Sequence, residues 1–152
     1  MANNSDRNKI VESKKSKRIR IVMAVLYFIE VVLTTFSFTW IADENGNIKE
    51  FTAFELAVRP AGYETTEQIK LAILFAIFII FPLICFFFCV LDKSNKKNVL
   101  SIICCLTCSC LITFGIGATI AMGAVVALLL YVLILFFTTQ NLLLSVAPNK
   151  EE

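Results

Sequence analysis

The sequence predicts an all-α membrane protein: an antiparallel four-helix transmembrane bundle with a structured extracytoplasmic loop between its first two helices. The composition is the first reason, because the 152 residues are 58% hydrophobic with a mean hydropathy of +0.79. Soluble domains are normally less than half apolar. The second reason is that the apolar residues lie in four runs of about 20 residues, the length that crosses a bilayer. The third is that charged residues gather between these runs.

These runs define a single membrane domain of residues 21–145. We expect its spans at about residues 21–41, 69–91, 98–117 and 119–141. A basic tail of residues 1–20 precedes the domain, a loop of residues 42–68 joins the first two spans, and a tail of residues 146–152 follows. Pro82 lies inside the second span, where we expect it to kink the helix.

Lysine and arginine are distributed unequally between the two sides. The N-terminal tail, the loop between the second and third spans and the C-terminal tail hold eleven of them, against three between the first two spans. The positive-inside rule therefore predicts a multi-pass plasma-membrane protein with both termini in the cytoplasm. A basic tail directly before a span is typical of contact with anionic lipid, so we expect no nucleic-acid partner.

The loop between the first two spans carries two local structural signals. Asn45-Gly46 favours a tight turn that closes a β-hairpin. Thr52 and Glu55 have the spacing of a capping box, which predicts a short helix over Ala53–Val58. A second capping box, from Thr65 to Gln68, predicts the start of the second span.

The stretch Phe51-Thr52-Ala53-Phe54-Glu55-Leu56-Ala57 resembles loops of small, uncharacterised four-span membrane proteins of bacteria. This resemblance implies a four-span protein of the bacterial cell membrane. It implies no activity.

The third span, residues 98–117, is built largely from small residues, and we expect the other helices to pack against it. Small side chains recur at every fourth position, which places them on one ridge of a helix: Ser101, Cys105, Ser109, Thr113 and Gly117. Gly123 and Ala127 repeat the spacing in the fourth span. The pattern predicts close packing of the third and fourth spans near their shared turn.

Glu30 is the one acidic or basic residue deep within any predicted span. With Tyr27, Thr34 and Ser37 it forms a polar stripe at helical spacing, which we expect to face the bundle interior. Burial without a cationic neighbour favours the protonated carboxyl group. Two interpretations stay open: a structural hydrogen bond, with Tyr131 as a partner at similar depth, or a proton or cation site.

The segment Glu30-Val31-Val32-Leu33-Thr34-Thr35-Phe36 resembles the first span of small multidrug-resistance transporters. In that family the acid is the proton and substrate site, so the resemblance implies this role for Glu30 alone. The chain departs from the family in its long first loop.

Six cysteines lie in the second and third spans: Cys85, Cys89, Cys104, Cys105, Cys108 and Cys110. Two interpretations are small apolar packing residues and a soft-metal or thiol redox site. We favour packing, and expect no metal and no cofactor, because the chain has no histidine.

The sequence lacks phosphate-binding loops and nucleophile motifs. We therefore expect a non-enzymatic membrane protein that acts through self-assembly or a membrane partner. The alternative is a small proton- or cation-coupled transporter that uses Glu30.

Overall fold

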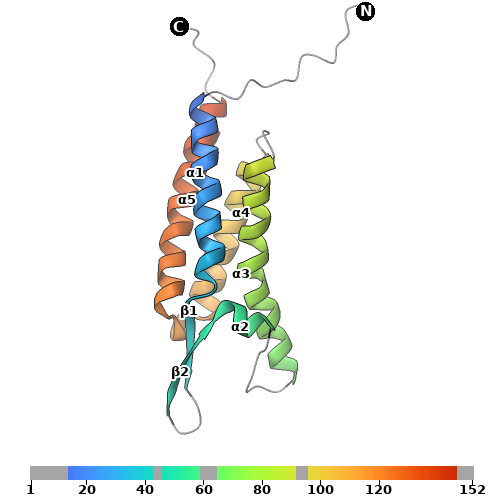
Figure 1. The fold of residues 1–152 in the computed structure, drawn as a ribbon, viewed down its shortest axis with the longest axis vertical. Helices are drawn as coiled ribbons and strands as arrows, with labels where there is room; N and C mark the ends of the chain where they lie inside the picture. Colours follow the sequence, from blue (N-terminus) through green and yellow to red (C-terminus); the bar gives the residue numbers. More distant parts are fainter. Residues whose placement is uncertain (1–13, 43–45, 59–64, 92–95, 147–152) are drawn as a thin grey trace, which may run out of the picture.

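Four long helices lie side by side in the computed structural model (Figure 1). The structure describes residues 14–42, 46–58, 65–91 and 96–146, so most of the two predicted tails lies outside the described residues. The helices are α1 (Lys14–Leu33), α3 (Thr65–Leu91), α4 (Lys96–Cys110) and α5 (Met122–Val146). Sequential neighbours run antiparallel, and α1 and α4 each contact both α3 and α5.

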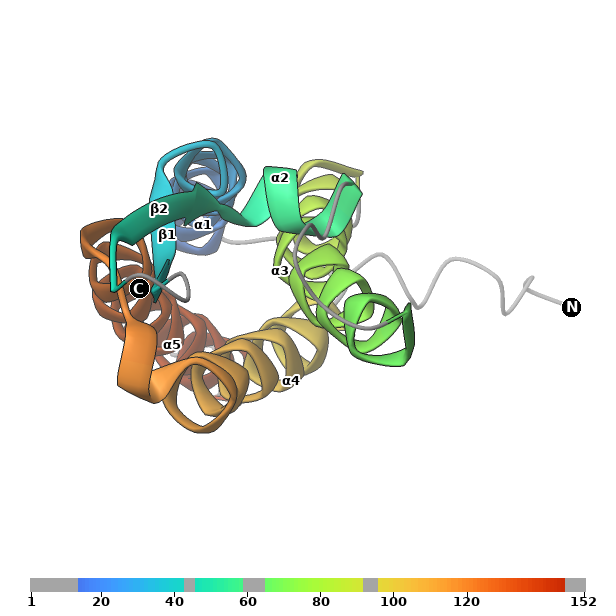
Figure 2. The ribbon, with the colours of Figure 1, turned by 90° about the horizontal axis from the view of Figure 1, so that it is seen from below.

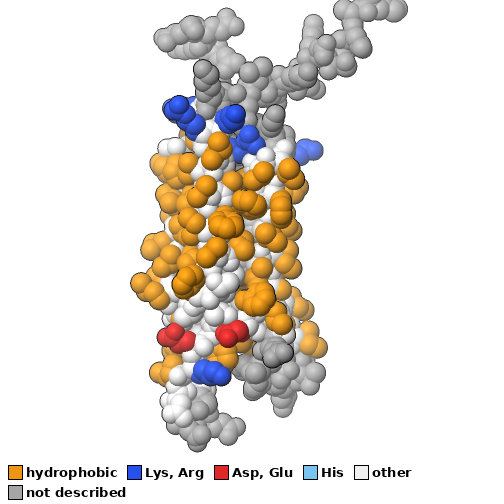
Figure 3. All heavy atoms as spheres, in the orientation of Figure 1, with side chains coloured by type: hydrophobic (Ala, Val, Ile, Leu, Met, Phe, Trp, Pro, Cys, Tyr) orange, Lys and Arg blue, Asp and Glu red, His pale blue; other side chains and the backbone are white. Residues whose placement is uncertain are grey.

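Three segments of the described chain are long and apolar enough to cross a membrane: Ile69–Leu91, Lys96–Gly115 and Met122–Ser145. Hydrophobic side chains cover the visible face of the bundle over most of its length (Figure 3). Most of the visible lysine and arginine side chains gather at the end from which the termini leave, whereas the visible acidic side chains lie near the opposite end together with a basic one (Figure 3). This distribution is that of a protein with a membrane-embedded middle.

Helix α1 is shorter than the sequence predicts, which corrects the expected span of residues 21–41. It ends at Leu33, and the hydroxyl groups of Thr34 and Thr35 donate hydrogen bonds to the carbonyl oxygens of Val31 and Val32. The following run of threonine and aromatic residues favours extended backbone. Residues Ser37–Ala42 accordingly form strand β1 instead of helix.

Strand β1 pairs in antiparallel register with β2 (Ile48–Thr52), so the predicted hairpin is confirmed, and the mostly helical fold carries this one two-stranded sheet among the described residues. Gly46 lies in the connection with φ of 80°, a conformation that glycine adopts without steric cost. Residues 43–45, including Asn45 of the predicted turn, lie outside the described residues.

The predicted short helix is also confirmed, as α2 (Ala53–Val58). Its capping box is complete: the Thr52 backbone N–H donates to Glu55 Oε2 at 3.0 Å, and the Glu55 N–H donates to Thr52 Oγ1 at 3.0 Å. The second predicted capping box coincides with the start of α3 at Thr65. Its side chains lie outside the described part of the chain.

We call residues 37–58 the hairpin–helix segment. Figure 2 shows this segment lying across one end of the bundle, with α2 beside α3. Phe38 of β1 is buried against Phe75 and Phe78 of α3, with ring centroids 6.3 and 5.2 Å away. The Ala121 N–H donates to the Phe38 carbonyl oxygen at 3.1 Å. Aromatic packing and backbone hydrogen bonds therefore fix the segment to the helices.

Helix α4 has a buried face that differs from the predicted ridge. Ser101 and Cys105 are buried, but Ser109 is half-buried and Thr113 and Gly117 are exposed. Because a helix turns 100° per residue, a strict four-residue spacing drifts by about 40° at each step. The buried face instead continues through Cys108 and Ile112. The α-helical part of α4 ends at Cys110, and a π-helical turn over Leu111–Gly115 follows it directly.

This difference makes a testable prediction about two serines of α4. Ser101→Leu should lower the free energy of unfolding by ~1–3 kcal/mol, because the fully buried site has no room for a larger side chain. Ser109→Leu is the matched control and should have a much smaller effect, because its side chain is half-buried. Thermal unfolding of both variants in detergent measures the difference. Equal losses would contradict the assigned face.

The capping box makes a prediction about pH. Hydrogen bonds from the backbone N–H and then the hydroxyl group of Thr52 lower the pKa of the Glu55 carboxyl below its usual value. The resulting stabilisation is complete above the unfolded-state pKa of about 4.3, and it is lost as the pH falls through the folded-state pKa. It is small, because Glu55 is exposed. In an NMR titration, Thr52→Ala should return the Glu55 midpoint towards about 4.3. An unchanged midpoint would mean that the Thr52 hydroxyl group does not stabilise the ionised carboxylate, because the backbone N–H is retained in this variant.

Candidate functional site

The candidate site is built around Glu30, which α1 directs into the bundle. Its side chain is only 1% exposed, and its Oε1 atom has no hydrogen-bond partner among the described residues. A buried carboxyl oxygen without a partner is costly, because burial removes the water that would otherwise bind it. The predicted inward direction of Glu30 thus agrees with the structure, whereas Oε1 lacks the proposed hydrogen bond to Tyr131.

Tyr27 lies one turn before Glu30 on the same face of α1 and is fully buried. Its hydroxyl group lies 3.6 Å from Cys105 Sγ of α4, a distance compatible with a weak hydrogen bond in which either atom donates. Cys105 belongs to the predicted ridge. The site thereby joins the two sequence features that we singled out independently, the polar stripe of α1 and the small residues of α4.

Cys108 and Tyr131 complete the surroundings of Glu30. Cys105 and Cys108 of α4 and Tyr131 of α5 are the titratable side chains close to the Glu30 carboxyl group among the described residues. All are buried. We call Tyr27, Glu30, Cys105, Cys108 and Tyr131 the Glu30 cluster. It draws on three helices and presents hydroxyl, thiol and carboxyl groups, all of which can gain or share a proton.

The rest of the predicted stripe lies beyond the end of α1. Thr34 is buried, but its hydroxyl group donates to the Val31 carbonyl oxygen at 2.6 Å, and its own carbonyl oxygen accepts the Phe54 N–H at 3.2 Å. Ser37 belongs to β1. Thr34 therefore fixes the junction between α1 and α2 rather than extending the Glu30 cluster.

The predicted packing residues of the fourth span divide into two. Ala127 is buried within the bundle. Gly123 instead faces β1, where a Cβ atom would overlap the Ser37 carbonyl oxygen and lie 3.2 Å from the carbonyl carbon. A Cβ atom on Gly117 would meet nothing within 4 Å. The close approach that requires glycine is therefore between α5 and the hairpin, not between α4 and α5.

A second buried polar layer, near the chain termini, was not predicted. Ser16 Oγ donates to Asn141 Oδ1 at 2.7 Å, and Asn141 Nδ2 donates to Asn98 Oδ1 at 2.9 Å. This layer ties α1, α4 and α5 together. Asn98 begins the third predicted span and Asn141 ends the fourth. Because consecutive spans run antiparallel, the two residues lie at the same depth, and this is the signal that could have paired them.

The cysteines are free thiols in the structure, and five of the six are buried. Among the described residues, no group of three or more His, Cys, Asp or Glu side chains is arranged to hold a metal ion. Cys85 donates a weak hydrogen bond to the Leu100 carbonyl oxygen at 3.9 Å. Their arrangement is that of small side chains that pack α3 against α4.

No protein-family model matches this chain, and neither a curated protein nor a solved structure matches it.

Proposed function

We propose that the protein is a non-enzymatic integral membrane protein that crosses the bilayer four times and acts by binding itself or a membrane partner. Helix α1 is the fourth crossing helix. Its basic first turns lower its average hydropathy, but its exposed face is continuously apolar from Ile21 to Val32. Exposed side chains of this kind are suited to contact with lipid: Ile21, Val22, Val25, Phe28, Ile29 and Val32.

The proposed orientation has both termini in the cytoplasm and the hairpin–helix segment outside. Exposed Lys15, Lys17 and Arg18 lie at the end with the termini. The opposite end carries exposed Glu50 and Glu55 together with Lys49. The larger excess of positive charge belongs inside.

The observation that carries the partner-binding role is the exposed apolar surface of the hairpin–helix segment. Ile48, Phe54 and Val58 are 68%, 53% and 61% exposed. The opposite side of the same segment is fixed by Leu56 and Phe38, both buried. Large apolar side chains on a rigid segment outside the hydrocarbon core favour a protein–protein contact.

Site-specific photo-crosslinking in native membranes tests this role. A photoreactive side chain in place of Phe54 should give a discrete protein adduct, whose mass separates a second copy from another partner. The matched control is Leu129, an exposed residue of α5 that we assign to lipid, which should give no such adduct. Adducts at both positions, or at neither, would contradict the proposed surface.

A proton or cation site at Glu30 is the second candidate function, and the unpartnered Oε1 atom favours it. Intramembrane acids are commonly functional. Liposomes containing the protein provide the test, with a pH gradient imposed and internal pH followed. If Glu30 carries protons, the unaltered protein dissipates the gradient and Glu30→Gln does not. Equal traces for both proteins would reject this candidate.

A further inference from the structure

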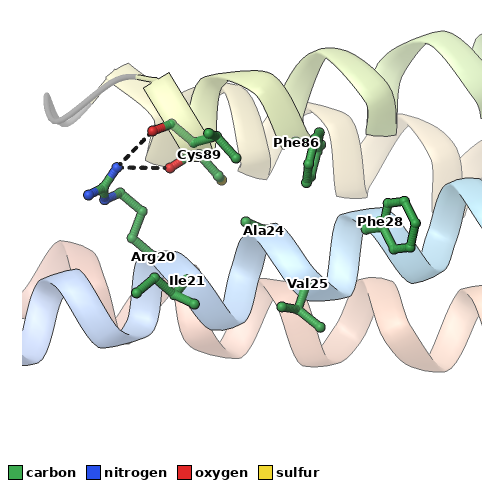
Figure 4. A pocket seen from close by; sticks show the side chains of 8 residues that line it. Arg20, Ile21, Ala24, Val25, Phe28, Phe86 and Cys89 are labelled. Carbon is green, nitrogen blue, oxygen red and sulfur yellow. Dashed lines mark hydrogen bonds between the residues drawn. The ribbon is translucent and has the colours of Figure 1, made fainter.

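A groove of about 350 Å³ runs between α1 and α3, close to the end of the bundle that carries the termini (Figure 4). One face of α1 forms the first wall of the groove, because its lining residues recur at four-residue intervals along the helix. Helix α3 supplies the opposite wall. The lining residues are Arg20, Ile21, Ala24, Val25, Phe28, Phe86, Cys89 and Val90. None of them belongs to the Glu30 cluster.

Both ends of the groove are defined by specific contacts. Away from the termini, the rings of Phe28 and Phe86 lie 6.1 Å apart. Near the termini, Arg20 Nη1 donates to the carbonyl oxygens of Cys89 and Val90 at 3.1 and 3.2 Å (Figure 4). These carbonyl groups lie in the last turn of α3, where a cation is stabilised by the helix dipole.

Ala24 makes the groove deep, because its small side chain leaves space between the two helices. The rim stays open to the surroundings: Ile21, Val25 and Val90 are 53%, 52% and 49% exposed. The groove is thus an apolar trough, accessible from the side of the bundle that we assign to lipid. It is long in the direction of the helices, and its one charged side chain, Arg20, is 8% exposed and lies at the end nearest the basic residues.

The chemistry of such a trough matches an acyl chain joined to an anionic headgroup. Apolar walls accept the chain, and a guanidinium group donates strongly to phosphate oxygens. Exposed Lys17 and Arg18 lie three and two residues before Arg20, respectively, and add positive charge at the same end. Basic residues at this depth attract anionic lipid.

We propose that this groove binds an anionic phospholipid, with an acyl chain against Ala24 and the phosphate group at the basic end of the groove, where Arg20 and exposed Lys17 lie. The inference rests on the proposed placement of α1 in the membrane, and it is independent of the role of Glu30 and of the partner surface around Phe54. Bound lipid would join α1 to α3 along this groove.

The test uses the full chain purified in detergent, with phosphatidylglycerol or phosphatidylcholine of identical chains added. Native mass spectrometry should show retained phosphatidylglycerol, with a rise in melting temperature that phosphatidylcholine does not give. Ala24→Leu fills the trough and should abolish both effects. Val25→Trp at the exposed rim is a second blocking variant, should Ala24→Leu fail to fold. Val132→Phe on α5, at a position 64% exposed and outside the groove, is the control and should bind like the unaltered protein.

The charge of Arg20 is tested separately. Arg20→Gln should weaken phosphatidylglycerol binding about tenfold and remove the preference over phosphatidylcholine, while Arg20→Lys should retain the preference. Equal retention of the two lipids by the unaltered protein would overturn the proposal, as would undiminished binding in both blocking variants. Failure of these tests leaves the crosslinking result at Phe54 unaffected, so the two proposals fail separately.

Discussion

Replacing Glu30 by lysine is expected to prevent stable folding, whereas Glu30→Gln retains the fold. The side chain is 1% exposed, and the titratable groups close to it among the described residues are hydroxyl and thiol groups, so an ammonium group there would be buried without a counter-charge. Insertion scales put the cost of a lysine at a helix centre at ~2.5–3.5 kcal/mol. Glutamine has the shape of the protonated acid and can accept or donate hydrogen bonds. Thermal unfolding and size-exclusion chromatography in detergent measure both variants.

The glutamine variant decides the charge state on which this prediction depends. If Glu30→Gln loses as much stability as Glu30→Lys, the native carboxyl group is ionised and has a cationic partner. Retained stability with glutamine supports the neutral acid.

Gly123→Val is expected to detach the hairpin from α5. A Cβ atom at this position would overlap the Ser37 backbone, and backbone held in a strand cannot move aside as a flexible side chain does. Overpacking of this kind costs ~1–3 kcal/mol, which exceeds the gain of under ~1 kcal/mol from removing a helical glycine. Hydrogen exchange at the Ala121 N–H, which bonds to the Phe38 carbonyl oxygen, should accelerate together with the loss of thermal stability.

Gly117→Val provides the control for this prediction, because a Cβ atom there meets nothing within 4 Å. Its hydrogen exchange and thermal stability should stay close to those of the unaltered protein. If the two glycine variants behave alike, the close approach of β1 to α5 is not what holds the hairpin–helix segment.

Local signals in the sequence were sufficient for the hairpin–helix segment. Asn45-Gly46 predicted the hairpin, and the spacing of Thr52 and Glu55 predicted α2 with its bounds, because both depend on interactions between residues close in the chain. The place where this segment docks was not predicted. It depends on Phe38 meeting α3 and on Gly123 meeting Ser37, which are contacts between distant parts of the chain.

The end of α1 was missed because hydropathy does not distinguish an apolar strand from an apolar helix. Residues 34–42 carry no charge and include several large apolar side chains, so the predicted span continued to Ile41. The distinguishing signal was the density of β-branched and aromatic residues from Thr34 onwards, together with two threonines that bond to the preceding helical carbonyl groups.

The candidate site was predictable on α1 alone. Spacing placed Tyr27 and Glu30 on one inward face, and both are buried. The contributions of Cys105 and Cys108 depend on the rotation of α4 about its axis. A strict four-residue ridge misjudged that rotation, because its direction drifts around a helix of 3.6 residues per turn.

In the proposed topology, α1 crosses the membrane and so places the hairpin–helix segment on the opposite side from the termini. Lys17 and Asn47 are exposed and lie on either side of the proposed crossing. Labelling of Lys17→Cys and Asn47→Cys with a membrane-impermeant maleimide in intact cells tests the claim, with the unaltered protein as the blank. We predict that position 47 is labelled from outside, and that position 17 is labelled only after the membrane is opened. Labelling of both positions from the same side would contradict the four-span account.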